Sequence, residues 1–182
     1  ATEETIGSLI ENDIRPKDIL TFEAFENGIA MANAIGGSTN AVLHLVALAR
    51  EVSINLTLSD FERIRKRTPH IANMRPGGAY VMIDLEKIGG IPPIMKMLYK
   101  QGLFNGEVIT VTGKTMKENL EHVEVDLSEH SQLVAPLSAP LHSQGTLMVL
   151  KGTLAPDGAV VKIAGLDAAR FRGTARVFDA EE

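Results

Sequence analysis

The pattern of apolar residues changes about two-thirds of the way along the chain, and this change limits the folds that it can adopt. Up to about residue 122, apolar side chains recur every three or four residues, as on one face of an amphipathic helix. After about residue 131 the chain has short apolar runs separated by Gly and Pro, which are typical of strands and turns. The sequence therefore predicts an α/β protein in which a mostly helical part precedes the opening strands of a β-barrel or sandwich.

Apolar spacing and capping residues together predict the helices. The first three are expected at residues 3–13, from Phe22 through Ala32, and from Thr39 to Glu51 with Ser38 as the N-cap. A fourth follows a capping box of Ser59 and Glu62. Three more are expected within Tyr80–Ile88, from Pro92 to near Gln101, and through Met116 and Leu120. The helix at 39–51 is apolar on most faces, so we expect it to be buried and its His44 to be a core histidine rather than a binding residue.

Alternating and β-branched runs predict the strands. They are expected at Glu107–Thr112, Leu133–Val134, Leu147–Leu150, Ala159–Ile163 and Ala175–Phe178. Asp157-Gly158 lies between apolar runs and is typical of a hairpin turn. A linker is expected at roughly 123–144, where Pro and His residues gather.

Composition excludes several classes of function. The chain has 182 residues and a formal net charge of −5, and this lack of basic surplus argues against binding to nucleic acid. It contains no cysteine, so this chain alone forms no disulfide, thiolate nucleophile or cysteine-ligated metal centre. Its five histidines show no metal-ligand spacing. We therefore expect no metal site made by this chain's own residues.

The apolar runs and the ends of the chain indicate where in the cell the protein is expected. No run approaches the ~18 apolar residues of a membrane helix, so no membrane partner is expected. The acidic start has no signal-peptide pattern, which predicts a cytoplasmic location, or an organellar one in a eukaryote. The chain begins without Met and stops abruptly at Glu182, so we expect an internal segment of a longer protein.

The sharpest local feature is the run Gly36-Gly37-Ser38-Thr39-Asn40 before an apolar helix. A glycine pair feeding a helix start exposes backbone N–H groups at the positive end of the helix dipole, where a carboxylate can bind. Gly37, Ser38, Thr39 and Asn40 are therefore our candidate substrate-binding residues, and an ordinary tight turn with an N-cap is the alternative. Ser38 lacks a G-x-S-x-G context, and Gly113-Lys114-Thr115 lacks the first glycine of a P-loop. The pattern predicts no catalytic residue.

Several motifs, in this order, resemble the middle of the dihydroxy-acid dehydratase family, which also contains phosphogluconate and sugar-acid dehydratases. The motifs are AIGGSTNAVLHL at 34–45, KIGGIP at 87–92, ITVTGKT at 109–115, KGTLAPDGAVVK at 151–162 and FRGTARVF at 171–178. Thr174 departs from the family's usual Pro. The motifs NAVLHL and LAPDGAVVK favour the branched-chain amino-acid enzyme over the sugar-acid members.

The resemblance implies a lyase that acts as the full-length protein. It would dehydrate a 2,3-dihydroxy acid of the 2,3-dihydroxyisovalerate type to a 2-keto acid, in valine and isoleucine biosynthesis, with an Fe–S cluster and magnesium. The family's cluster cysteines, metal-binding acids and catalytic serine have no counterpart here, so the resemblance carries over no catalytic or metal residue and this chain alone would be inactive. Residues 1–130 would end the dehydratase α/β domain, residues 131–182 would begin a swivelling-type β-barrel domain, and the intact protein would be a homodimer.

Two alternatives stay open. One is a sugar-acid or phosphogluconate dehydratase of the same family, although a phosphosugar pocket would call for a Lys/Arg cluster that the sequence does not mark. The other is a non-catalytic scaffold or binding domain that has kept the fold, because a fold by itself does not establish chemistry.

Overall fold

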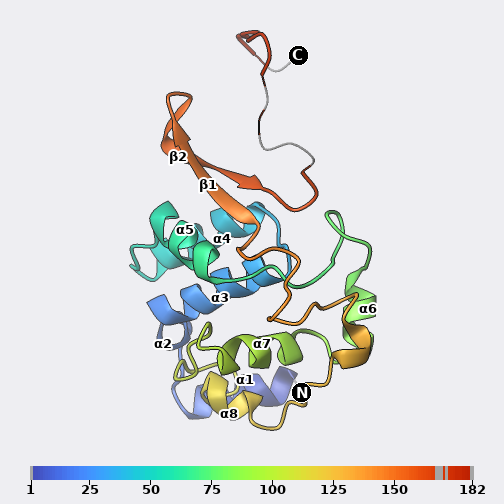
Figure 1. The fold of residues 1–182 in the computed structure, drawn as a ribbon. Coiled ribbons are helices and arrows are strands. Elements are labelled where there is room, and N and C mark those ends of the chain that lie inside the picture. Colours follow the sequence, from blue (N-terminus) through green and yellow to red (C-terminus); the bar gives the residue numbers. More distant parts are fainter. Residues whose placement is uncertain (1, 167–169, 171, 181–182) are drawn as a thin grey trace.

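A computed structural model describes residues 2–166, 170 and 172–180 as a mixed α/β structure (Figure 1). This confirms the predicted α/β class. Phe171, the first residue of the last family motif, lies outside the described residues. The elements are α1 (Thr2–Glu11), α2 (Pro16–Ile19), α3 (Phe22–Ala34), α4 (Asn40–Glu51), α5 (Leu58–Arg67), α6 (Met82–Lys87), α7 (Ile91–Lys100), α8 (Met116–Leu120), the 3₁₀ helix η1 (Ser128–His130), β1 (Leu147–Gly152) and β2 (Ala155–Lys162).

Helix α3 lies in the middle of the molecule (Figure 1). It contacts α4 and α5, and β1 packs on α5, whereas α7 and α8 pack together on the opposite side of α3. Phe25 and Ile29 of α3 are buried in the hydrophobic core. The Thr21 hydroxyl caps this helix by accepting a hydrogen bond of 3.3 Å from the Ala24 amide.

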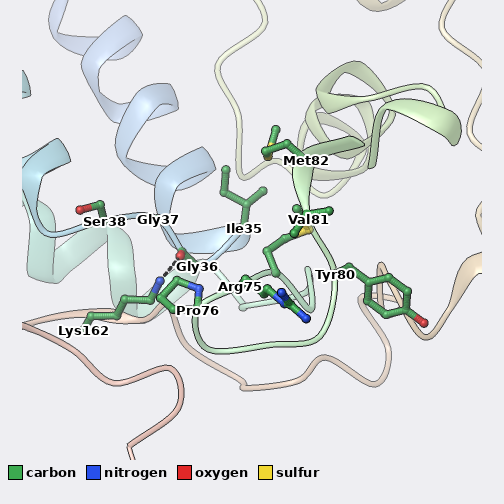
Figure 2. Close-up of a pocket in the computed structure, with 11 residues that line it drawn as sticks. Ile35, Gly36, Gly37, Ser38, Arg75, Pro76, Tyr80, Val81, Met82 and Lys162 are labelled. Atoms are coloured by element: carbon green, nitrogen blue, oxygen red, sulfur yellow. Dashed lines mark hydrogen bonds between the residues drawn. The ribbon is translucent and has the colours of Figure 1, made fainter. Parts of the chain in front are cut away.

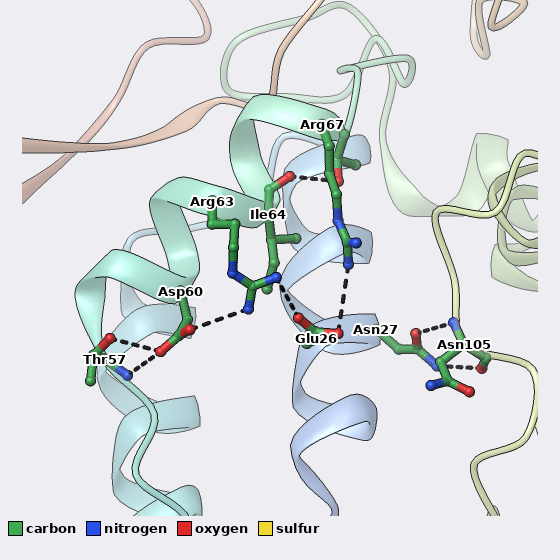
Figure 3. Close-up of polar contacts among 9 residues, drawn as sticks. Glu26, Asn27, Thr57, Asp60, Arg63, Ile64, Arg67 and Asn105 are labelled. Carbon is green, nitrogen blue, oxygen red and sulfur yellow. Dashed lines mark hydrogen bonds and ion pairs between the residues drawn. The ribbon is translucent and has the colours of Figure 1, made fainter.

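A network of charged side chains holds α3 against α5 (Figure 3). Arg63 of α5 pairs with Glu26 of α3 at 2.7 Å and with Asp60 at 3.2 Å. Asp60 also accepts hydrogen bonds from the amide and hydroxyl of Thr57, at 3.0 and 2.7 Å. Thr57 is therefore the N-terminal cap of α5. The predicted capping box of Ser59 and Glu62 is wrong by two residues, because the box is formed by Thr57 and Asp60.

An extended segment at 70–73 connects the helical part to the chain beyond residue 130. Its amides at Ile71 and Ala72 both donate to the carbonyl of Ala34, at 2.9 and 3.1 Å. On its other side, Ile71 accepts a hydrogen bond from the Ala135 amide at 2.8 Å. The region expected to be a linker is thus partly packed, and the core includes buried Leu133, Val134 and Leu147 from the second half.

Strands β1 and β2 form an antiparallel hairpin whose register pairs Leu147 with Lys162. The turn falls at residues 153–154, and Asp157-Gly158 lies inside β2. The predicted turn at Asp157-Gly158 is therefore wrong. Gly158 has a φ of +110°, and an irregularity in the register follows Leu150. The glycine serves this distorted strand rather than a turn.

Three other strand predictions are wrong. Within Glu107–Thr112 only Ile109 makes a β-bridge, because the Thr110 hydroxyl donates to the Lys114 carbonyl at 3.0 Å and closes a turn. Val134 likewise makes a single bridge, to Ala72. Residues 175–178 are described and are not in a strand.

Helix α4 is less buried than its composition predicts. Of its described residues only Val42 and Ala49 are buried, and the exposed fraction of Leu43 is 70%. The prediction of a buried helix is wrong because α4 packs on α3 along one side while its other faces are uncovered by the described residues. None of the described helices is long and apolar enough to cross a membrane.

The buried side chain of Asn33 joins the hairpin to α3. Its Oδ1 atom accepts a hydrogen bond of 3.1 Å from the Leu147 amide, and its Nδ2 atom donates to the Ile29 carbonyl at 3.0 Å. A side chain at Gly145 would overlap Asn33, so glycine is required at this approach. The start of β1 therefore has one fixed position on α3.

We predict that Asn33→Ala destabilises the full-length protein by about 1–3 kcal/mol, because it leaves the buried Leu147 amide without an acceptor. Chemical denaturation followed by circular dichroism measures the loss. The matched control is Asn12→Ala, an exposed side chain whose removal is expected to change stability by less than about 0.5 kcal/mol. Equal effects of the two substitutions would contradict the assigned role of Asn33.

Candidate functional site

A cavity of about 430 Å³ lies where three distant parts of the chain meet (Figure 2). The turn between α3 and α4 supplies one side, the loop before α6 supplies another, and the end of β2 closes it. The lining residues are Ile35, Gly36, Gly37, Ser38, Met74, Arg75, Pro76, Tyr80, Val81, Met82 and Lys162.

One side of the cavity is positively charged. The Lys162 ammonium donates a 2.5 Å hydrogen bond to the Gly36 carbonyl, as Figure 2 shows. Burial lowers the pKa of Lys162 from its ordinary value. Among the described residues no carboxylate pairs with Lys162 or with Arg75. The Val81 amide, then Lys87 and lastly the charge of Arg75 lower the pKa of Asp84. The cavity therefore has two cations available to an anionic ligand.

The start of α4 adds backbone donors to this charged side. The Ser38 hydroxyl accepts a 3.2 Å hydrogen bond from the Asn40 amide, and no described residue accepts one from the amides of Ser38 and Thr39. Thr39 directly precedes α4 but makes no side-chain capping bond, so the predicted cap Ser38 supplies the hydroxyl that accepts from the first turn. These free amides and the helix dipole favour a bound anion together with the two cations.

Much of the remaining cavity lining is apolar. Ile35, Val81 and Met82 belong to it, and the exposed fractions of Val81 and Met82 are 40% and 57%. The Tyr80 side chain points away from the glycine turn in Figure 2, and its hydroxyl lies 3.4 Å from the Gln132 side chain. The cavity thus suits a small molecule with an anionic end and an aliphatic end.

The structure divides the predicted site residues into two pairs. Gly37 and Ser38 line the cavity, whereas Thr39 and Asn40 follow them in the first turn of α4 and are not part of its lining. Sequence reasoning missed Arg75 and Lys162 as site residues. Each had a weak indication in the sequence. Lys162 is the last residue of the KGTLAPDGAVVK motif, and Arg75 lies just before the glycine pair at 77–78.

Two histidines lie behind the cavity. The rings of His70 and His142 stack with centroids 5.3 Å apart and an interplanar angle of 9°. Burial, together with the nearby charges of His142 and Lys162, lowers the pKa of His70 to about 4. The exposed fraction of His70 is 5%, and its Nδ1 atom has no hydrogen-bond partner among the described residues. His70, and not His44, is the core histidine: His44 is exposed on α4, so that prediction is wrong.

The described residues offer no ligand set for a metal. They contain no group of three or more His, Cys, Asp or Glu side chains that could hold an ion. The stacked imidazoles of His70 and His142 lie face to face, so they form a packing contact rather than a pair of converging ligands.

Comparison with known families matches both parts of the chain. The N-terminal model of the dihydroxy-acid/6-phosphogluconate dehydratases matches residues 1–119, and the C-terminal model of the same family matches residues 132–182. The chain therefore belongs to the dihydroxy-acid/6-phosphogluconate dehydratase family. The resemblance drawn from the motifs is confirmed.

Individual relatives narrow the comparison to dihydroxy-acid dehydratases. Proteins of that name from Saccharolobus islandicus and Saccharolobus solfataricus are 53% and 52% identical to this chain over 181 residues. Dihydroxy-acid dehydratase 2 of Staphylococcus saprophyticus is 52% identical over the same length. Each alignment covers 100% of this chain and 32% of the relative, so the chain spans about a third of the length of these curated relatives.

The lowered pKa of His70 predicts an acid-sensitive fold. An unfolded histidine is protonated below pH ~6.5, whereas folded His70 stays neutral down to about 4. Its contribution to stability is therefore complete above pH 6.5 and is lost as the pH falls towards 4, by on the order of 2 kcal/mol at pH 5. We predict that the thermal midpoint of the full-length protein falls less between pH 7 and pH 5 in His70→Gln than in the wild type.

The matched control for this measurement is His122→Gln, which changes an exposed histidine. It is expected to leave the fall in thermal midpoint as it is in the wild type. If His122→Gln reduced that fall as much as His70→Gln does, the buried imidazole would not be its source.

Proposed function

We propose that the full-length protein is a hydro-lyase that dehydrates 2,3-dihydroxy acids to 2-keto acids, and that this chain forms one side of its substrate site. Gly37, Ser38, Arg75 and Lys162 would receive the substrate carboxylate. The names of the relatives and the family match support the reaction class. Thr39 and Asn40 are proposed to take part through the first turn of α4, as the sequence predicts.

The observation that carries the proposal is the mixed lining of the cavity, in which two cationic side chains accompany apolar ones. Arg75, Lys162 and the amide of Ser38 suit a carboxylate, while Ile35, Val81 and Met82 suit an alkyl chain. A polyhydroxylated sugar acid would leave its hydroxyl groups against these apolar side chains without partners, at a cost in binding free energy. The cavity therefore favours aliphatic substrates of the 2,3-dihydroxyisovalerate type and a role in valine and isoleucine biosynthesis.

The proposed chemistry includes an Fe–S cluster and magnesium, and the residues of this chain do not fit either group. The chain has no cysteine to ligate iron, and the described residues have no cluster of acidic or histidine ligands. We propose that the ligands of both groups lie in parts of the protein outside these residues. This chain then contributes the binding and orientation of the substrate's carboxylate and alkyl chain.

The organisation of the intact protein is proposed on the same basis. Residues 1–130 would complete the dehydratase α/β domain, and residues 131–182 would begin a swivelling-type β-barrel domain to which the β1–β2 hairpin contributes. The open edges of this hairpin would pair with further strands of that barrel. The protein would act as a cytoplasmic homodimer, or as an organellar one in a eukaryote, and would bind neither nucleic acid nor a membrane.

The test is turnover by the full-length protein, purified anaerobically with iron and magnesium supplied. We expect it to convert 2,3-dihydroxyisovalerate to its 2-keto acid with a higher kcat/KM than gluconate or 6-phosphogluconate. Preference for either sugar acid would favour the sugar-acid alternative. No turnover of any of the three acids by protein that has its cluster would favour the non-catalytic scaffold.

We predict that Lys162→Met in the full-length enzyme raises KM for 2,3-dihydroxyisovalerate by roughly 10–100-fold, the value of one charge-assisted hydrogen bond. Methionine retains most of the side chain's volume, so packing at the end of β2 is preserved. Lys151→Met is the control, because it removes an exposed lysine of β1 outside the cavity lining. An unchanged KM in Lys162→Met would remove the proposed carboxylate site.

A further inference from the structure

His70 supports the glycine turn from behind the cavity. A Cβ atom placed on Gly36 would lie 2.9 Å from the His70 Nε2 atom, so the ring is already packed against the glycine backbone. Gly36 has a φ of +70°, a conformation that glycine adopts without strain. The position of the turn is thus fixed by the imidazole on one side while its other side lines the cavity.

His70 is itself held rigidly. Its amide donates to the His142 carbonyl at 3.0 Å, and the His142 amide donates back to the His70 carbonyl at 3.2 Å. The parallel stacking of the two rings adds a second contact between the same residues. Backbone and side chain therefore fix the imidazole relative to the chain that leads into β1.

Gly36 connects this support to the charged side of the cavity. Its carbonyl accepts the hydrogen bond from the Lys162 ammonium, and Gly37 and Ser38 follow it directly. A shift of the Gly36 backbone would move the acceptor of Lys162 and the amides that precede α4 together. Neither histidine lines the cavity, and the packing of the His70 ring against Gly36 is the contact through which His70 reaches it.

We propose that His70 is a positioning residue for the carboxylate site, acting through Gly36 on Lys162 and the start of α4. The inference rests on the proposed function and adds to it a residue that does not touch the substrate. His142 is the second member of the same support. A purely structural role would reduce the amount of folded enzyme without changing the affinity of the folded fraction.

The experiment measures KM and kcat for 2,3-dihydroxyisovalerate in the full-length enzyme. We expect His70→Ala to raise KM roughly fivefold to tenfold, with kcat per cluster-loaded enzyme within about twofold of wild type. His70→Gln, whose amide reaches about as far as Nε2, is expected to restore most of the wild-type KM. The control is His44→Ala, an exposed histidine of α4, which is expected to change neither constant.

A double-mutant cycle with Lys162→Met tests the route of the effect. If His70 acts through Lys162, adding His70→Ala to Lys162→Met raises KM by less than it does in the wild type. An unchanged KM in His70→Ala, or effects on KM that multiply in the double variant, would overturn the inference while leaving the proposed function intact. A wild-type enzyme that dehydrates no 2,3-dihydroxy acid would overturn the proposed function, and this inference with it.

Discussion

The buried amide of Asn33 determines where the hairpin lies, and the cavity depends on that placement. Asn33 accepts the Leu147 amide, and Leu147 is paired across the hairpin with Lys162. Lys162 in turn donates to Gly36, three residues after Asn33 in the chain. These contacts connect Asn33 through the hairpin back to Gly36. The Lys162 ammonium in the cavity is therefore positioned by α3, the helix that leads into the glycine turn.

A second contact strengthens this placement. Glu62 of α5 accepts the Val149 amide at 3.2 Å while its carboxylate is paired with the buried Arg65 at 2.8 Å. The hydrogen bond from Arg65, followed by the other contacts, lowers the pKa of Glu62 despite its partial burial. Strand β1 is therefore held by one polar contact to α3 and one to α5, in addition to the contact of Lys162 with Gly36. Removing either partner would leave a buried polar group unsatisfied.

The helices could be predicted because their signals are local. Apolar spacing and capping residues lie within a few positions of each other, and α3, α6, α7 and α8 form where these patterns indicate. The strands were less predictable. The β-branched run at 107–112 forms a turn because the Thr110 hydroxyl bonds to the backbone nearby, and Asp157-Gly158 has the same residues as a common turn yet lies within β2.

Only the glycine-turn residues of the site could be predicted from the sequence. Gly37 and Ser38 are visible because a glycine pair before a helix has a local physical meaning. Lys162 is 126 residues from Gly36, and no periodicity or spacing links two residues at that separation. His70 carries no local signal either, since its role depends on His142 and on the backbone of Gly36. The motifs shared with the family contain Lys162 but do not show what it contacts.

The contact of Gly145 with Asn33 has a consequence for building chimeras between members of this family. A crossover placed between residues 119 and 132, in the gap between the two family matches, would separate Asn33 and Arg65 from Gly145, which contacts both. The parental sequences would then have to agree at these three positions for the hairpin to dock. Compatibility at this contact, rather than overall identity, would decide which exchanges of the C-terminal part produce a folded protein.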